Sequence, residues 1–302
     1  MELKEQQEPL SVEDQIENLK SLGLIIEDED LAASFLNDVS YFRFIKAYSL
    51  GLKRKNSNYH SGVSFNQLME LYLFNSNLRQ LMFAQIEHIE VNLRCRVANH
   101  FSLSYGVLGY LDEANFADKA YHSAFMKEIK SEIKRNKRAP FIRNFRENYV
   151  DGQVPLYALV EIFSFGTLSK LLKNMKSPDK KAIASTFDIR YPYLESWIES
   201  LAYVRNLCAH YGRLYNVKLT KTPRLFSEDK RKGIGNNRIF GVIICMKHLL
   251  DSDKGWDSFV DSLEKLFIKY PHVRKESMGF PSNWKDLLSP ASVDSTNDSK
   301  QE

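Results

Sequence analysis

One segment indicates how this chain folds: Val204-Arg205-Asn206-Leu207-Cys208-Ala209-His210-Tyr211-Gly212-Arg213-Leu214-Tyr215-Asn216. On a helix, at about 100° per residue, it separates into two faces of opposite chemistry. The polar face gathers Arg205, Asn206, Ala209, His210, Arg213 and Asn216, and the apolar face gathers Val204, Leu207, Cys208, Tyr211, Leu214 and Tyr215. We therefore expect the apolar face to lie in a helical core. The polar face then forms a site rich in arginine, histidine and asparagine.

The polar face offers the groups that cleave RNA without a metal ion. That reaction needs a base for the 2'-hydroxyl, positive charge near the phosphate and an acid for the leaving 5'-oxygen. His210 is the candidate acid or base, and Arg205 suits a bidentate clamp on the phosphate. Asn206 would orient His210 or bind a phosphate oxygen, with support from Arg213 and Asn216. A lone histidine can equally cap a helix or pack inside a bundle, and spacing alone leaves both readings open.

The order R-N-x-x-A-H, followed by x-x-R, resembles the R-x4-H signature of HEPN-domain ribonucleases. Four further blocks in the chain are similar to the Abi-like family of the AbiD/AbiF type. They are Gln15 to Ile26, Tyr41-Phe42-Arg43, Glu161 to Ser169, and Met278-Gly279-Phe280-Pro281-x-x-Trp284. Members of this family are bacterial abortive-infection proteins of the HEPN group, implicated in defence against phage.

The resemblance implies a metal-independent endoribonuclease toxin that acts by 2'-OH attack, with Arg205, Asn206 and His210 as catalytic residues. It implies RNA as substrate, a homodimer in which two motifs face each other, and possible control by a small noncoding RNA. No cofactor and no metal ion are expected. The alternative is a non-catalytic HEPN protein that binds RNA in complex with a small noncoding RNA. A third reading is a toxin silenced by a nucleotidyltransferase partner.

The charge of the chain is unevenly distributed. The formal net charge is +4 over 302 residues, but residues 1–14 carry −4 and residues 289–302 carry −2. Residues 15–288 therefore carry +10. A basic body suits a polyanionic partner, although many unrelated proteins share this balance.

Composition also bears on the compartment. The three cysteines, Cys95, Cys208 and Cys245, are an odd number in apolar surroundings, which suits buried thiols in a reducing compartment. The N-terminus is acidic and polar, and no run of about 18 uncharged apolar residues occurs. We expect a cytoplasmic protein that does not insert into a membrane.

Hydrophobic periodicity is helical almost throughout, and it predicts an all-α fold, by resemblance a HEPN-type helical bundle with an N-terminal helical extension. The expected divisions are a disordered N-terminus at 1–11, a helical subdomain at 12–60, a HEPN-like domain at 61–288 and a disordered tail at 289–302. In the subdomain, Ile16, Leu19, Leu22, Phe35, Val39, Phe42 and Ile45 recur at helical spacing. The last helices are expected near 239–250 and 256–270.

A long helix is predicted from about Phe65 to His100, with Ser64 as its N-cap. Leu68, Leu71, Leu78, Met82, Ile86, Ile89, Leu93 and Val97 form its buried side. Glu90 and Arg94 lie four residues apart, which is typical of an ordinary surface ion pair. By resemblance, their I-E-x-x-L-R segment could instead face the catalytic helix, so that Glu87, Glu90 or Arg94 orients its arginine or histidine.

Two basic segments are candidate RNA-binding surfaces. Positions 127–146 hold eight Lys or Arg against two Glu, interleaved with Phe141 and Phe145 and followed by Tyr149. Positions 218–241 are predicted to form a long basic loop. The candidate residues are Lys134, Arg135, Lys137, Arg138, Arg143, Arg146, Lys218, Lys221 and Arg224. Phosphate contacts and base stacking favour RNA, but a solvated helix with core aromatics explains the first segment equally well.

Overall fold

The structure is a computed structural model that describes residues 8–250 and 255–289. Within these residues every regular element is a helix, and β-structure is limited to isolated bridges such as Ile25 with Ser64. The predicted all-α fold is confirmed. Most of the expected disordered ends, at residues 1–7 and 290–302, lies outside the described residues.

The chain divides into two compact units. The first comprises Met1–Leu78 and Leu263–Arg274, and the second comprises Arg79–Ser262 and Lys275–Glu302. Two helices, α3 (Phe65–Tyr105) and α12 (Gly255–Lys269), pass from one unit to the other. The boundary between the two units on α3 lies between Leu78 and Arg79.

The first unit is built on two short capped helices and a cluster of aromatic rings. In α1 (Val12–Ser21), Ser11 accepts a hydrogen bond from the amide of Asp14; in α2 (Glu29–Asp38), Asp28 accepts one from Leu31. These caps satisfy amides that have no partner within the helix. Edge-to-face contacts join Phe35, Phe44, Phe65 and Tyr72, with ring centroids 4.8 to 6.2 Å apart. They tie α2 to the start of α3.

The prediction that Phe42 belongs to the core of this unit is wrong. Phe42 is 78% exposed, whereas Phe44 is fully buried. The backbone is extended at Val39, and the chain resumes as a π-helical turn over Phe42–Lys46. That interruption changes which side chains face the core. A helical spacing of three or four residues continued across Val39 therefore predicts Phe42, and not Phe44, to be buried.

Helix α3 begins and is oriented as the sequence predicts. The hydroxyl of Ser64 accepts a hydrogen bond from the amide of Gln67 at 3.2 Å, so Ser64 is the N-cap. The helix ends at Tyr105, five residues beyond His100. Its predicted buried residues, Leu68, Leu71, Leu78, Met82, Ile86, Ile89, Leu93 and Val97, are all 3% exposed or less.

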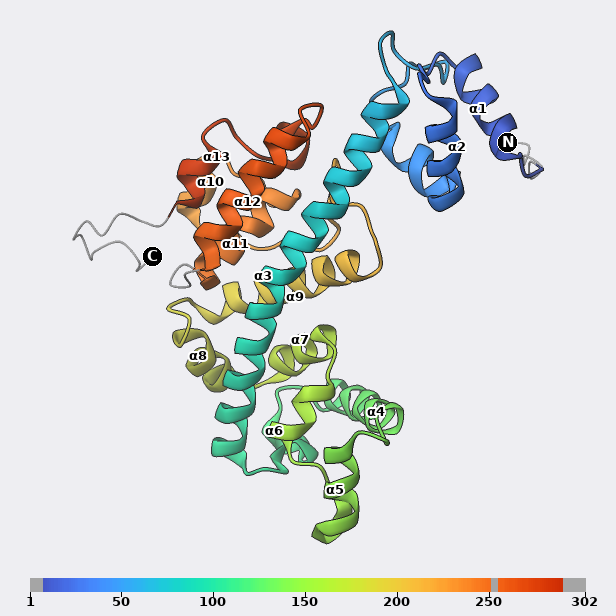
Figure 1. Cartoon of the computed structure of the whole chain (residues 1–302). Helices are drawn as coiled ribbons and strands as arrows, with labels where there is room; N and C mark the ends of the chain where they lie inside the picture. Colours follow the sequence, from blue (N-terminus) through green and yellow to red (C-terminus); the bar gives the residue numbers. More distant parts are fainter. Residues whose placement is uncertain (1–7, 251–254, 290–302) are drawn as a thin grey trace, which may run out of the picture. The chain divides into compact units, whose positions relative to one another are not determined.

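The second unit continues from α3 through a series of shorter helices. They are α4 (Lys119–Arg135), α5 (Pro140–Asn148), α6 (Leu156–Leu159), α7 (Phe165–Asn174), α8 (Ser177–Ser185), α9 (Tyr191–Ala209), α10 (Ser227–Arg231), α11 (Ile239–Leu250) and α13 (Trp284–Leu288). Short 3-10 turns lie at Gly109–Leu111, Glu113–Asn115, Val150–Gly152, Val160–Ile162 and Lys275–Met278. Helix α9 packs against α7, α8 and α11 and so lies at the centre of this unit. Figure 1 shows α4, α5 and α6 gathered near the C-terminal end of α3.

The segment 218–241 is not the plain loop that its composition predicts. It contains α10, and its last residues already belong to α11. Its backbone is fastened to α9, because the indole of Trp197 donates to the carbonyl of Arg224 at 2.5 Å and Ser200 donates to that of Lys221 at 3.0 Å. Leu219, Leu225 and Ile234 are buried. The loop prediction missed these apolar residues, which hold the segment in place.

Among the described residues, no single helix has both the length and the apolar character needed to cross a membrane. One bent pair, Val150–Ile162 with Phe165–Asn174, meets these criteria together by length and composition only, with an angle of 114° between its parts.

Replacing Ser164 by alanine tests the N-cap of α7. Ser164 is the N-cap of α7, and its hydroxyl accepts the amide hydrogen of Thr167 at 3.0 Å. We expect Ser164→Ala to lower the free energy of unfolding by about 1 kcal/mol, measured by urea denaturation. Ser131→Ala, at an exposed position inside α4, is the matched control and should change stability by less than about 0.5 kcal/mol. Equal effects of the two changes would contradict the assigned cap.

Candidate functional site

Helix α9 ends inside the segment 204–216, which carries the R-x4-H pattern. Its last helical residue is Ala209, and His210 is the C-cap. The amide of Gly212 donates to the carbonyl of Leu207 at 2.6 Å, and that of Tyr211 donates to the carbonyl of Cys208 at 3.3 Å. These two bonds define a Schellman motif, in which the first residue after the C-cap has a left-handed backbone conformation. That residue is Tyr211, with φ of 58°.

The early end of α9 corrects the predicted helical face. Arg213 and Asn216 lie beyond the helix, so the count of 100° per residue does not apply to them. Asn216 has its own left-handed backbone, φ of 49°, and its side-chain oxygen accepts a hydrogen bond from Arg238 at 3.4 Å. Tyr211, predicted to be a core residue, is 67% exposed. Gly212 follows the helix end and is not inside the helix.

Arg205 lies in the last turns of α9, and His210, five residues later, is its C-cap. Five residues correspond to about 140° around the helix axis. Arg205 is half-buried, whereas Asn206 and His210 are exposed. The backbone carbonyl of Asn206 accepts the amide hydrogen of His210 at 3.0 Å. Within one chain, the side chains of Arg205 and His210 therefore leave the helix about 140° apart.

A buried carboxylate connects α3 with the motif. One oxygen of Glu90 accepts a hydrogen bond from Arg94, and the other lies 3.6 Å from Nε of Arg205. Glu90 is only 7% exposed. Its ion pair with Arg94 is therefore buried, and not the ordinary surface ion pair that a spacing of four residues suggests. Arg94 also donates to the carbonyls of Val160 and Phe163, the latter at 2.7 Å. Glu90 and Arg94 thereby join α3, α9 and the turn before α7.

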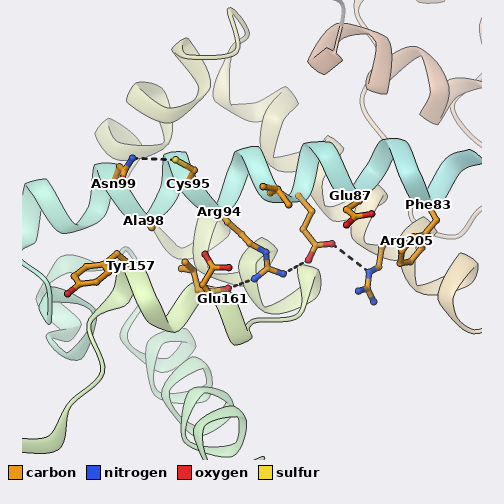
Figure 2. A pocket seen from close by; sticks show the side chains of 12 residues that line it. Phe83, Glu87, Arg94, Cys95, Ala98, Asn99, Tyr157, Glu161 and Arg205 are labelled. Carbon is orange, nitrogen blue, oxygen red and sulfur yellow. Dashed lines mark hydrogen bonds and ion pairs between the residues drawn. The ribbon is translucent and has the colours of Figure 1, made fainter. Parts of the chain in front are cut away.

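Arg205 is held from two sides. Its guanidinium carbon lies 5.3 Å from the ring centre of Phe83, within the range of a cation–π contact. Its buried Nε has no hydrogen-bond partner among the described residues, because the 3.6 Å to Glu90 is an ion-pair distance. Figure 2 draws the ion pair with Glu90 as a dashed line that ends at Nε of Arg205, and the two terminal nitrogens lie on the other side of the guanidinium. Glu90 thus does not occupy the fork of the guanidinium.

These residues line a groove of about 470 Å³ along α3, here called the Arg205 groove. Its lining consists of Phe83, Glu87, Glu90, Val91, Arg94, Cys95, Ala98, Asn99, Tyr157, Val160, Glu161 and Arg205. Tyr157 lies at one end and Arg205 at the other, with Arg94 and Glu161 between them (Figure 2). His210 is not among the lining residues.

Of the residues that line the Arg205 groove, only Glu87, Glu90, Arg94 and Arg205 were predicted from the sequence to have a functional role. A signal was present, because Phe83, Glu87, Val91, Cys95 and Asn99 recur every four residues on α3. That spacing marks one face of a helix, and it differs from the buried face. Tyr157 and Glu161 are distant in sequence, and no pattern linked them to α3.

Burial suppresses the ionisation of two of the three cysteine thiols, Cys208 and Cys245. Burial raises the pKa of the Cys208 thiol to about 12, although the positive charges of Arg79 and Arg205 act to lower it. Burial also raises the pKa of the Cys245 thiol well above its ordinary value. Cys95 is exposed and lines the Arg205 groove. The expectation of three buried thiols is therefore wrong for Cys95.

The predicted RNA-binding residues do not all lie together. Lys134, Lys137 and Arg146 line a second groove of about 660 Å³, with Lys130, Ile133 and residues 151–154. Arg135 pairs with Glu132 at 2.8 Å, and Arg143 lies 3.9 Å from Glu147. Arg138 is exposed between α4 and α5.

The three cations predicted from the segment after α9 occupy other positions. Lys221 pairs with Glu199 on α9 at 2.5 Å. Lys218 and Arg224 are exposed in the segment fastened to α9. None of these three side chains lines the Arg205 groove, although they follow the motif closely in the sequence.

One protein-family model matches the chain. Residues 34–216 match the family described as Abi-like protein, which is more than half of the chain. The match includes α3, the Arg205 groove and the motif at the end of α9. The chain belongs to the Abi-like family, and membership suggests a role in abortive infection. Neither a curated protein nor a solved structure matches the chain significantly.

Replacing Tyr211 by glycine tests the strained helix end. A left-handed conformation costs a non-glycine residue about 1–2 kcal/mol, and glycine adopts it readily. We expect Tyr211→Gly to raise the free energy of unfolding by about 1 kcal/mol, measured by urea denaturation. Gly212→Ala is the comparison, since its Cβ would lie 3.0 Å from the carbonyl oxygen of Leu207 and should destabilise the protein. A destabilising Tyr211→Gly would contradict the assigned conformation.

Replacing Arg94 tests the junction between α3 and the turn before α7. Arg94→Ala leaves the buried Glu90 with one cation fewer and two carbonyls without their donor, so we expect a loss of about 2–4 kcal/mol in unfolding free energy. Arg94→Lys keeps the charge but not the planar fork, and should lose less. A change below about 0.5 kcal/mol for Arg94→Ala would show that this junction contributes little.

Proposed function

We propose that this protein is a metal-independent endoribonuclease toxin of a bacterial anti-phage, abortive-infection system, acting in the cytoplasm. It cleaves RNA by attack of the 2'-hydroxyl on the adjacent phosphate, which gives a 2',3'-cyclic phosphate and a 5'-hydroxyl. The observation that carries the proposal is the ion pair between Glu90 and Nε of Arg205, which leaves the two terminal nitrogens of Arg205 directed away from Glu90.

Arg205 has the geometry of a phosphate clamp. Anchoring through Nε leaves two parallel N–H donors, which match two oxygens of a phosphate. Glu90 reduces the rotational freedom of the side chain without occupying that fork. The charge of Glu90 is shared with Arg94. A preorganised cation of this kind stabilises the negative charge that develops on the phosphate in the transition state.

His210 supplies the proton transfer. It is exposed at the end of α9 and bonded through its backbone to Asn206. Because Arg205 and His210 point about 140° apart on one helix, we propose that the site is completed by a second copy of the chain. In such a homodimer, the histidine of one chain reaches the phosphate held by the arginine of the other.

The alternative function is RNA binding without cleavage, as a complex with a small noncoding RNA. The half-exposed Arg205 and the basic residues of the second unit would suffice for that role. What favours cleavage is the buried Glu90, because an arginine that only attracts RNA needs no partner to fix its orientation. The same small RNA would act as a regulator if the protein is a toxin.

The test is incubation of end-labelled RNA with the purified protein in EDTA. We expect the wild type to cleave, and His210→Ala and Arg205→Ala to lose activity by at least about 100-fold. Arg205→Lys should also be impaired, because a point charge replaces the planar fork. His88→Ala and Arg231→Ala, at exposed positions on α3 and α10, are matched controls and should remain active.

Two results would reject the proposed function. The first is activity that disappears in EDTA and returns with a divalent ion. The second is unchanged cleavage by His210→Ala and Arg205→Ala. Retention of RNA by every variant without any cleavage would support the binding function instead. The absorbance ratio at 260 and 280 nm shows whether a co-purified RNA is inhibiting the protein.

A further inference from the structure

The second unit carries a groove lined by positive charge on the side of α4 that faces α5. Lys130 and Lys134 lie one helical turn apart on α4, Lys137 follows the helix end, and Arg146 comes from α5. We call it the basic groove. Its remaining lining is Ile133 and residues 151–154, with Asp151 as the single acid. Within residues 8–250 and 255–289, none of the four cations forms an ion pair, and all four are exposed.

An aromatic cluster adjoins this groove. The ring of Phe145, the neighbour of Arg146, lies 4.8 Å from that of Tyr149 and 6.4 Å from that of Tyr157. Tyr149 is 56% exposed and Tyr157 is 49% exposed. The buried residue of α5 is Ile142, so the two tyrosines are not needed to anchor that helix. They present flat apolar surfaces to solvent.

Tyr157 connects the cluster with the Arg205 groove. It contacts Phe145 on one side, and it lines the Arg205 groove at the end opposite Arg205 (Figure 2). Glu87 and Glu161, both exposed, lie in that groove. In Figure 2 Glu161 lies between Tyr157 and Arg205, whereas Glu87 lies near Arg205. The charge of Glu161 repels phosphates from the middle of the groove, so a neutral base fits there better than a phosphate.

We propose that these three features form one binding track for single-stranded RNA. The backbone phosphates lie in the basic groove, unpaired bases stack on Tyr149 and Tyr157, and the strand continues into the Arg205 groove. The inference rests on the proposed function for its ligand and deepens it by naming the form of RNA. Phosphate contacts hold any nucleic acid, but stacking on exposed rings requires bases that are free of a duplex.

Fluorescence anisotropy with a labelled, fully 2'-O-methylated oligoribonucleotide tests the track in the full-length protein. This probe cannot be cleaved by 2'-hydroxyl attack, so binding is measured apart from catalysis. We expect the single strand to bind at least tenfold more tightly than the same sequence as a duplex. The double variant Lys134→Glu/Lys137→Glu should weaken binding and lower the slope of log K against log salt by about 1.4, at about 0.7 for each lost phosphate contact on a single strand.

Matched variants separate charge from stacking. Lys181→Glu/Lys230→Glu makes the same charge change at exposed positions on α8 and α10, and should preserve the salt slope. Tyr149→Ala should weaken single-strand binding about tenfold, whereas Tyr149→Phe should retain it. Duplex binding should be unaffected by either change at Tyr149.

Alkylation of Cys95 tests whether the strand reaches the Arg205 groove. Cys95 is exposed in that groove while Cys208 and Cys245 are buried, so iodoacetamide should report on Cys95 alone. The single-stranded probe should slow its modification at least fivefold, and Tyr157→Ala should remove most of that protection.

Three outcomes would overturn the track. They are equal affinity for single strand and duplex, equal effects of the two double lysine variants, and binding without protection of Cys95. Retention of phosphopeptide or double-stranded DNA in preference to the RNA probe would also overturn it. If the variants behave as expected while wild-type protein cleaves no RNA, the track stands and the proposed nuclease function fails.

Discussion

The carboxylate of Glu90 is the constraint on which the site depends. It is buried on α3, accepts a hydrogen bond from Arg94 and forms an ion pair with Arg205. A buried charge is costly unless it is paired, and here two cations share it. One of them, Arg94, fixes the turn before α7, and the other comes from the last turns of α9. The position of Arg205 therefore follows from the packing of α3 against the rest of the second unit.

The end of α9 determines the position of His210, the second residue of the proposed site. A Schellman motif with Tyr211 in the left-handed position ends the helix immediately after Ala209 and leaves His210 exposed. Strained, exposed residues of this kind cluster at functional sites, where the surrounding structure maintains them. Glu90 orders the arginine, and the helix end exposes the histidine. This separation of the two groups on one chain is the physical reason for proposing a site shared between two chains.

Much of the fold followed from sequence because its signals are local. The buried face of α3, the Ser64 cap and helices α11 and α12 all rest on helical periodicity and capping residues. The errors arose where tertiary structure overrides local pattern. The polar and apolar faces of 204–216 were counted as one helix, although the backbone reverses at Tyr211 and removes Arg213 and Asn216 from that face. Phe42 was misplaced because a π-helical turn shifts the phase. Tyr157 and Glu161 line the groove through contacts between distant elements, which no spacing reveals.

A double-mutant cycle between Glu90 and Arg205 measures the central interaction most directly. Urea unfolding of the wild type, Glu90→Gln, Arg205→Gln and the double variant gives the coupling energy between the two side chains. Because the pair is largely removed from water on the Glu90 side, we expect a favourable coupling of about 1–2 kcal/mol. Additive effects, with a coupling below about 0.3 kcal/mol, would contradict the view that Glu90 holds Arg205 in place.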